Sequence, residues 1–166
     1  MTALEITSLK NFMNQLLAGS VFDIFLLEEA SIATAFTVSI DGHINKSFYP
    51  ESERDSESLP YDLKPWSEVK ELCFSLIKGR YTPINFKFVL QLKPEHMEGL
   101  IRKELTDASL SGLKALMIII KFDGTKAVIT TGASFHTFVP DKEPEKLWDK
   151  TFSKYLSDKG ISYETL

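Results

Sequence analysis

The sequence contains a single cysteine, Cys73, and no long apolar segment. One cysteine excludes an internal disulfide framework and is typical of proteins from a reducing cytoplasm. The apolar runs, such as residues 116–120, are far shorter than the ~20 residues that a membrane-spanning helix needs. Residues 1–6 lack a basic region followed by an apolar stretch, so no secretory signal peptide is expected. These absences predict a cytoplasmic protein that does not enter a membrane.

Recognisable catalytic and metal-binding patterns are also missing. His43, His96 and His136 lie far apart in the sequence, whereas metal ligands usually follow a characteristic spacing. Ser134 and His136 are expected on one face of a strand, but no carboxylate is marked as a third catalytic partner. Cys73 is expected on the apolar face of a helix, where a thiol is buried and unreactive. We expect no cofactor, no metal ion and no catalytic residue, and the sequence favours a non-enzymatic protein over an enzyme.

The sequence also lacks clear patterns for a phosphate-binding site or a site with two carboxylates. The strand-to-helix junctions at residues 6–8 and 92–94 lack the glycines of a phosphate-binding loop. Glu28 and Glu29 are adjacent carboxylates, but neighbouring residues of a strand point to opposite faces of the sheet. These two side chains can therefore act together only where a bulge interrupts the strand.

What the sequence does have is the composition of an ordinary soluble protein, with 43% hydrophobic and 25% charged residues. A chain of 166 residues fits a single domain. The net charge of -4 is uneven, because residues 1–60 carry three basic and nine acidic side chains while residues 61–166 carry sixteen and fourteen. This asymmetry fits a polar partner surface on the second half, or simply an acidic loop in the first. The strongly basic patch of a nucleic-acid-binding protein is absent.

A pattern of secondary structure occurs twice in the chain. Each copy, at residues 2–49 and 84–138, begins with a short apolar strand that runs straight into an amphipathic helix and continues into antiparallel strands. In the first copy, Asp41-Gly42 is expected to form a tight hairpin turn. The strands of this copy are expected at residues 4–6, 22–28, 34–40 and 44–49.

The second copy contains the clearest strand of the chain, residues 84–92, in which apolar and mostly polar side chains alternate. Pro94 then begins a helix, and Asp123-Gly124 is expected to form a second hairpin turn. Gly132 is expected at a bulge or break. The later strands of this copy are expected at residues 115–122, 126–131 and 134–138.

Two helices and a loop lie outside the repeated pattern. Residues 50–64 hold five acidic side chains and two prolines, which predicts a mobile, solvated loop. Prolines begin an inserted helix at residues 65–78 and a C-terminal helix at residues 144–158. With four helices and about ten short, mostly antiparallel strands, the sequence predicts an α+β fold. Its helices should pack on one face of a sheet whose other face is wetter.

The repeated unit, over residues 4–48 and 86–138, resembles the domain of DNA sliding clamps in topology and spacing. The strand-to-helix junctions and the two Asp-Gly turns carry the resemblance. It implies a clamp-like domain of two half-repeats related by an approximate two-fold axis, and a sheet able to join a second copy edge to edge as a homodimer. The whole sequence also looks like small uncharacterised proteins of anaerobic Gram-positive bacteria, a family with no assigned activity.

The chain departs from the clamps in the charge on its helices. In clamps the helices face DNA, whereas the two corresponding helices here expose three basic and three acidic groups. Affinity for duplex DNA comes largely from neutralising phosphates, so a near-neutral face supplies little of it. A nucleic-acid role is therefore the weaker alternative, and its contacts would be Lys10, Arg102 and Lys103.

A further group of side chains is a candidate for contact with an anion or a base. Lys78, Arg80 and Tyr81, with Lys87 on the following strand, bring cations near an aromatic ring. Cations at the end of a helix also complement the helix dipole without binding any ligand. Both interpretations remain open from the sequence.

Two functions remain open as well. The first is a non-enzymatic cytoplasmic binding or scaffold protein that acts through a groove, a sheet edge or self-association, with a protein partner or a second copy. The second is a small-molecule-binding protein or enzyme with a pocket between the helices and the sheet. Trp66, Trp148, Phe152 and Tyr155 would line that pocket, and they equally fit a filled core.

Overall fold

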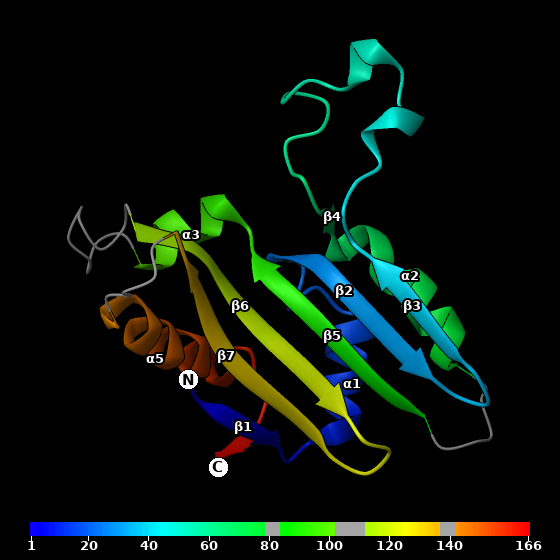
Figure 1. Ribbon diagram of the computed structural model, residues 1–166. Coiled ribbons are helices and arrows are strands. Elements are labelled where there is room, and N and C mark those ends of the chain that lie inside the picture. Colours follow the sequence, from blue (N-terminus) through cyan, green and yellow to red (C-terminus); the bar gives the residue numbers. More distant parts are fainter. Residues whose placement is uncertain (79–83, 102–111, 137–141) are drawn as a thin grey trace.

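The computed structural model describes residues 1–78, 84–101, 112–136 and 142–166. These residues form four α-helices and an eight-stranded sheet in which every pairing is antiparallel. The long helices lie behind the sheet in Figure 1, and none of the described helices crosses its front. The prediction of an α+β fold is therefore confirmed.

The strand that the sequence predicts most clearly, at residues 84–92, lies in the interior of the sheet. The eight strands are β1 (Ala3–Ile6), β2 (Phe25–Ala33), β3 (Thr37–Asp41), β4 (Lys64–Pro65), β5 (Asn85–Leu92), β6 (Leu113–Phe122), β7 (Ala127–Phe135) and β8 (Tyr163–Thr165). Their order across the sheet is β3-β2-β5-β6-β7-β1-β8, and β4 pairs with β2 beside this path. The short strand β8 was not predicted from the sequence.

Both helices that prolines predicted outside the repeat are present. The four helices are α1 (Leu9–Leu17), α2 (Trp66–Ile77), α3 (Pro94–Ile101) and α5 (Glu143–Asp158). Two short 3-10 helices, Lys46–Phe48 and Glu51–Glu53, lie between β3 and β4. No helix in the described ranges is both long and apolar enough to cross a bilayer.

The core lies between the helices and the sheet, and its largest buried side chains are aromatic. Phe25 of β2 contacts both Trp148 and Phe152 of α5, with ring centroids 6.3 and 6.1 Å apart. Trp66 of α2 packs against Phe88 of β5 with the ring centroids 5.0 Å apart. Each tryptophan N–H donates to a backbone carbonyl at 2.9 Å, so the buried polar ends of both rings are satisfied.

The order of elements recurs, but the strand pairings do not. The sequence strand, helix, strand, strand occurs as β1-α1-β2-β3 and again as β5-α3-β6-β7. Strand β5 pairs with β6 of its own unit, whereas β1 pairs with β7 and β8 and lies far from β2. The expected two-fold relation between half-repeats is not confirmed, because β2 pairs with β5 rather than with β1.

The first Asp-Gly turn was predicted wrongly. Strands β2 and β3 are instead joined through residues 34–36, and the expected return strand at residues 44–49 is absent. Asp41 Oδ1 accepts a hydrogen bond from the amide of His43 at 3.0 Å, which turns the chain away from the sheet. Only an isolated bridge between His43 and Leu63 follows.

Gly42 is required by a close approach of two backbones. Its amide donates to the carbonyl oxygen of Glu28 at 2.9 Å. A Cβ atom at this position would lie 1.8 Å from the carbonyl oxygen of Leu27, a distance that no side chain tolerates. The glycine therefore allows β2 and the following segment to lie in contact, rather than closing a hairpin.

The second Asp-Gly turn was predicted correctly, since it joins β6 to β7. Gly124 has φ +99°, the left-handed region that favours glycine. The carboxylate of Asp123 accepts from the amides of Lys126 and Thr125 at 2.8 Å each, and these bonds lower the pKa of Asp123 to about 2. The predicted irregularity at Gly132 is wrong, because β7 continues through it and the register shift lies between Leu113 and Ala115.

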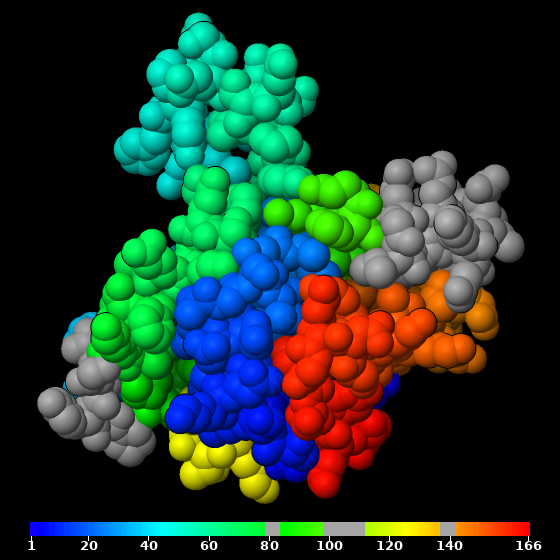
Figure 2. Space-filling view, turned by 180° about the vertical axis from the view of Figure 1, so that it is seen from behind, coloured from blue at the N-terminus to red at the C-terminus, as the bar shows by residue number. Residues whose placement is uncertain are grey.

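An arm projects from the sheet between β3 and β4, and Figures 1 and 2 show it standing away from the body. We call residues 44–62 the acidic arm, because they hold two basic and five acidic side chains. Its base is closed by a hydrogen bond from the Ile44 amide to the Asp62 carbonyl at 2.9 Å. Its side chains are mostly exposed, as the composition predicted.

Candidate functional site

The face of the sheet opposite the helices carries two lysines side by side. Lys87 of β5 points to this open face, because its neighbours Phe86 and Phe88 are buried in the core. The register places Lys121 of β6 directly opposite Lys87, and Val128 of β7 directly opposite Lys121. Two lysines and one apolar side chain therefore lie in a row across three neighbouring strands.

A hollow of about 470 Å³ lies on the open face, near the turn that joins β6 to β7. We call it the basic hollow, because Lys87, Lys121 and Lys126 all line it. Val128 contributes apolar surface to the same space, whereas the ring of Phe122 packs against Phe86 on the core face with the ring centroids 5.2 Å apart. The remaining lining residues are Ser31, Ala33, Asn85, Phe86 and Asp123.

The three ammonium groups are only weakly neutralised by the protein. Lys87 Nζ lies 3.7 Å from a Glu29 carboxylate oxygen, and Lys126 Nζ lies 3.6 Å from one of Glu5. Exposed ion pairs of this kind contribute only about 0–1 kcal/mol. Lys121 is exposed and has no ion pair with any residue that the structure describes. An anion that enters the basic hollow would therefore meet little competition.

A second hollow, of about 720 Å³, adjoins the first along β2 and β3 and shares Lys87 with it. The pairing of β2 with β5 shifts between Leu27 and Glu29, so Glu28 occupies a bulge. The sequence indicated that Glu28 and Glu29 can act together only at such a bulge. Both side chains line the second hollow. One carboxylate oxygen of Glu28 is buried with no hydrogen-bond partner in the described part of the chain.

His43 and Asp41 form the other polar pair of this second hollow. The Nδ1 atom of His43 lies 2.7 Å from Asp41 Oδ1, and the hydrogen bond from the His43 amide is the main cause that lowers the pKa of Asp41. His43 is exposed, as predicted. Among the described residues, no group of three or more His, Cys, Asp or Glu side chains is arranged to hold a metal ion.

The lysines that the sequence singled out do not gather at one site. Lys87 lines the basic hollow, whereas Lys78 ends α2 behind the sheet, with its Nζ 5.7 Å from the ring centroid of Phe74. Lys10 is exposed on α1. Arg80, Tyr81, Arg102 and Lys103 lie outside the described residues.

Sequence reasoning missed Lys121 and Lys126. These two lysines flank the Asp-Gly turn that was predicted correctly, so the hairpin alone could have placed them on neighbouring strands. Their approach to Lys87 depends on the pairing of β5 with β6. No local pattern marks that pairing.

Cys73 has the inert environment that the sequence predicted. The side chain is fully buried on α2, and desolvation raises the pKa of its thiol to about 11. A thiol with such a pKa carries almost no thiolate at neutral pH. Ser134 and His136 form no hydrogen bond with each other in the described structure.

The aromatic residues proposed as a pocket lining instead fill the core. Trp66, Trp148 and Phe152 are essentially inaccessible to solvent. The hydroxyl of Tyr155 donates to the carbonyl oxygen of Val21. None of these four side chains lines the basic hollow or the hollow beside it.

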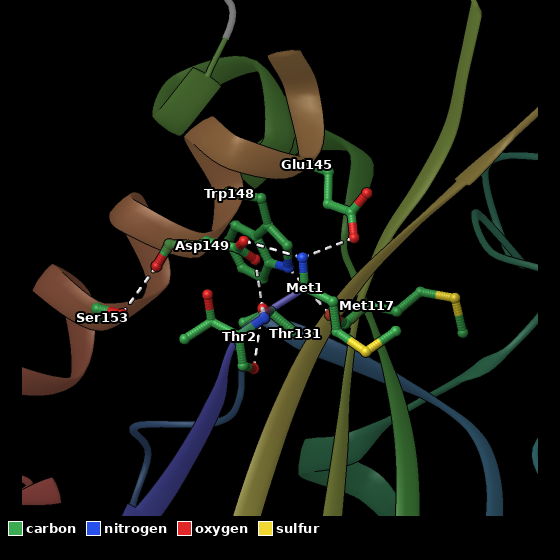
Figure 3. Close-up of polar contacts among 8 residues, drawn as sticks. All are labelled: Met1, Thr2, Met117, Thr131, Glu145, Trp148, Asp149 and Ser153. Carbon is green, nitrogen blue, oxygen red and sulfur yellow. Dashed lines mark hydrogen bonds and ion pairs between the residues drawn. The ribbon is translucent and has the colours of Figure 1, made fainter. Parts of the chain in front are cut away.

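A polar cluster anchors the start of the chain to α5 (Figure 3). The amine of Met1 lies 2.8 Å from Glu145 Oε1 and 3.1 Å from Asp149 Oδ2. Thr131 is the one buried polar side chain of the described core, and its hydroxyl donates to Asp149 while accepting from the Thr2 amide at 3.0 Å. The hydrogen bond to Glu145 is the main cause that raises the pKa of the amine. This cluster is closed by its own contacts and serves structure.

Comparison with known protein families gives a match over most of the chain. Residues 15–164 match a family described as "Family of unknown function (DUF5721)". No curated protein and no solved structure matches the chain.

Proposed function

The chain belongs to this family of unknown function, and we propose that it is a single-domain, non-enzymatic binding protein of the bacterial cytoplasm. Its basic hollow would receive a partner that carries negative charge beside an apolar group. The observation that supports this most directly is the convergence of Lys87, Lys121 and Lys126 on one apolar-lined space.

The dimensions and chemistry of the basic hollow favour such a partner. Binding sites typically measure ~300–1,000 Å³ and combine a mostly apolar lining with a few placed polar groups. The basic hollow has about 470 Å³, with aliphatic surface between three cations. Apolar contact would supply affinity, while the ammonium groups would select an anion and orient it.

The chain shares with sliding clamps only the recurring order of its elements. Strands β1 and β5 have different neighbours, and the lysines of the basic hollow lie on the face away from the long helices. A clamp would present its helices to DNA, so the proposed binding face is a different one. Fold alone does not assign function.

The proposal is tested with a small aromatic sulfonate, 8-anilinonaphthalene-1-sulfonate, as a probe. We expect its NMR titration to shift amide signals of β5, β6 and β7 around the basic hollow. Lys121→Ala should weaken binding by up to about tenfold, since tenfold corresponds to ~1.4 kcal/mol. Higher salt should weaken binding further.

The matched control is Lys150→Ala, because Lys150 is an exposed lysine of α5 that does not line the basic hollow. This variant should bind the probe as the unaltered protein does. Equal affinities in the Lys121 and Lys150 variants, or shifts confined to other elements, would overturn the proposed function.

A further inference from the structure

We infer that the partner held in the basic hollow is the acidic arm of a second copy of this chain, so that two copies exchange arms reciprocally. This inference rests on the proposed function, because it names the occupant of the same hollow. Three features support it. They are the negative charge and exposed aromatic ring of the arm, the hydrogen bonds within the arm, and the positions of arm and hollow on the sheet.

The acidic arm carries negative charge and an exposed aromatic ring, which complement the lysines of the basic hollow. Glu51, Glu53, Asp55 and Glu57 are all exposed, and the arm as a whole carries a net charge of -3. Beside these carboxylates, Phe48 is 84% exposed. Negative charge next to a large apolar ring is the combination that three lysines around Val128 would accept.

The arm is held in shape by its own hydrogen bonds although it projects into solvent. Arg54 donates through Nε to the carbonyl of Tyr49 at 2.8 Å. Asp55 Oδ1 accepts from the amides of Ser58 and Glu57 at 2.9 and 3.2 Å. A segment with this much internal order loses less conformational entropy on docking than a flexible loop does.

The arm and the basic hollow lie at opposite ends of the sheet. Strand β4, at the base of the arm, pairs with Leu26 and Leu27 near the start of β2. The basic hollow is lined by Ser31 and Ala33, at the end of the same strand. A two-fold axis that runs across the strands would therefore bring the arm end of each copy over the hollow end of the other. Closed two-fold dimers of this kind use the same contact twice.

The charge-swapped experiment uses two variants of the full chain. One variant, Lys87→Glu with Lys121→Glu, keeps the acidic arm and reverses the hollow. The other, Glu51→Lys with Glu53→Lys, keeps the hollow and reverses the arm. Each variant alone would place like charges at both contacts, whereas the mixture would restore attraction at both.

Sedimentation and light scattering measure the outcome at about 100 μM protein, well above a micromolar Kd. We expect the unaltered protein to dimerise, each charge-reversed variant to be monomeric, and an equimolar mixture of the two to dimerise again. Phe48→Ser should raise the dimer Kd by about tenfold or more. Leu72→Ser, which removes an exposed apolar side chain from α2, should leave the Kd unchanged. Circular dichroism confirms that every variant is folded.

Two results would overturn the inference. One is a monomeric unaltered protein at this concentration, and the other is a dimer that persists in each charge-reversed variant alone, as edge-to-edge pairing of sheets would give. The proposed function fails separately, since it requires the sulfonate probe to depend on Lys121. A monomer whose probe binding still depends on Lys121 would retain the hollow as a binding site and exclude the arm as its occupant.

Discussion

Lys87 and Lys121 face each other directly across β5 and β6 on the open face of the sheet. Like charges placed directly opposite one another destabilise a β-sheet, whereas opposite charges stabilise it. The pair therefore reduces stability at a position where many other side chains would raise it. Binding of an anion in the basic hollow would explain why two lysines occupy this unfavourable pair of positions.

Replacing one lysine of this pair should make the protein more stable. Lys121→Glu would convert a repulsive cross-strand pair into an attractive one, and we expect the free energy of unfolding to rise by roughly 0.2–1 kcal/mol. Urea unfolding at low salt measures the change, which should shrink in 1 M NaCl because salt screens exposed charges. Lys150→Glu on α5 is the control. A less stable Lys121 variant would show that the pair does not repel.

Two glycines of the sheet region should respond to alanine in opposite ways. Gly42→Ala would force a Cβ to within 1.8 Å of the Leu27 carbonyl oxygen, so β2 and the segment beside it must separate. We expect a loss of about 1–3 kcal/mol in the free energy of unfolding, as for other overpacked sites.

Gly132→Ala is the matched control for that substitution. Its added Cβ would have no atom within 4 Å, and its backbone is that of an ordinary strand. Alanine should be neutral there or raise stability by up to about 1 kcal/mol, because it restricts the unfolded chain. The two variants are compared by urea unfolding. Equal effects would mean that Gly42 does not lie in close contact with β2.

The turn between β6 and β7 should contribute to the loss of stability in acid. Hydrogen bonds from the Lys126 and Thr125 amides lower the pKa of Asp123 from 3.8 to about 2 in the folded protein. A folded-state pKa below the unfolded value adds stability above about pH 3.8, and this stability is lost as the pH falls toward 2. We expect Asp123→Asn to make unfolding less sensitive to pH over that window.

Urea unfolding between pH 2 and 5, a window spanning both pKa values, measures that dependence. Asp158→Asn, at an exposed carboxylate of α5, is the control and should retain the original dependence. An Asp123 variant with an unchanged slope against pH would contradict the assigned hydrogen bonds.

Adjacent threonines of β7 should differ sharply. Thr131 is buried and bonds both the Thr2 amide and the Asp149 carboxylate, whereas Thr130 points to the open face. Thr131→Val would leave these partners unsatisfied and should cost about 1–3 kcal/mol. Thr130→Val should change stability by less than about 0.5 kcal/mol. Thermal or urea unfolding of both variants measures these changes in stability. Similar losses of stability in the two variants would exclude the buried hydrogen bonds of Thr131 as the cause.

Much of the secondary structure could be read from local patterns, because the deciding contacts are local. The alternation in residues 84–92 predicted β5, and the prolines at 65 and 144 marked the starts of α2 and α5 closely. The two Asp-Gly pairs show where local patterns fail to predict the structure. Both fit a hairpin, yet only Asp123-Gly124 forms one, since the Gly42 amide instead bonds Glu28 from a different strand.

The candidate site was harder to predict for the same physical reason. Lys87 was predicted as a contact for an anion or a base together with Lys78, Arg80 and Tyr81, but its neighbours in the basic hollow come from β6 and from the turn that follows. The register between β5 and β6 is set by long-range packing of the core face, with Phe88 opposite Ile120, and no short motif encodes it. The bulge that brings Glu28 and Glu29 to one hollow is likewise a property of the paired strands.

The pairing of β1 with β7 has a consequence for how the chain folds. The amide of Thr2 meets the hydroxyl of Thr131, a partner 129 positions later. Strand β1 can therefore join the sheet only after β7 has been synthesised. Such distant closure slows folding, so the amides of β1 would be among the last to become protected from solvent exchange.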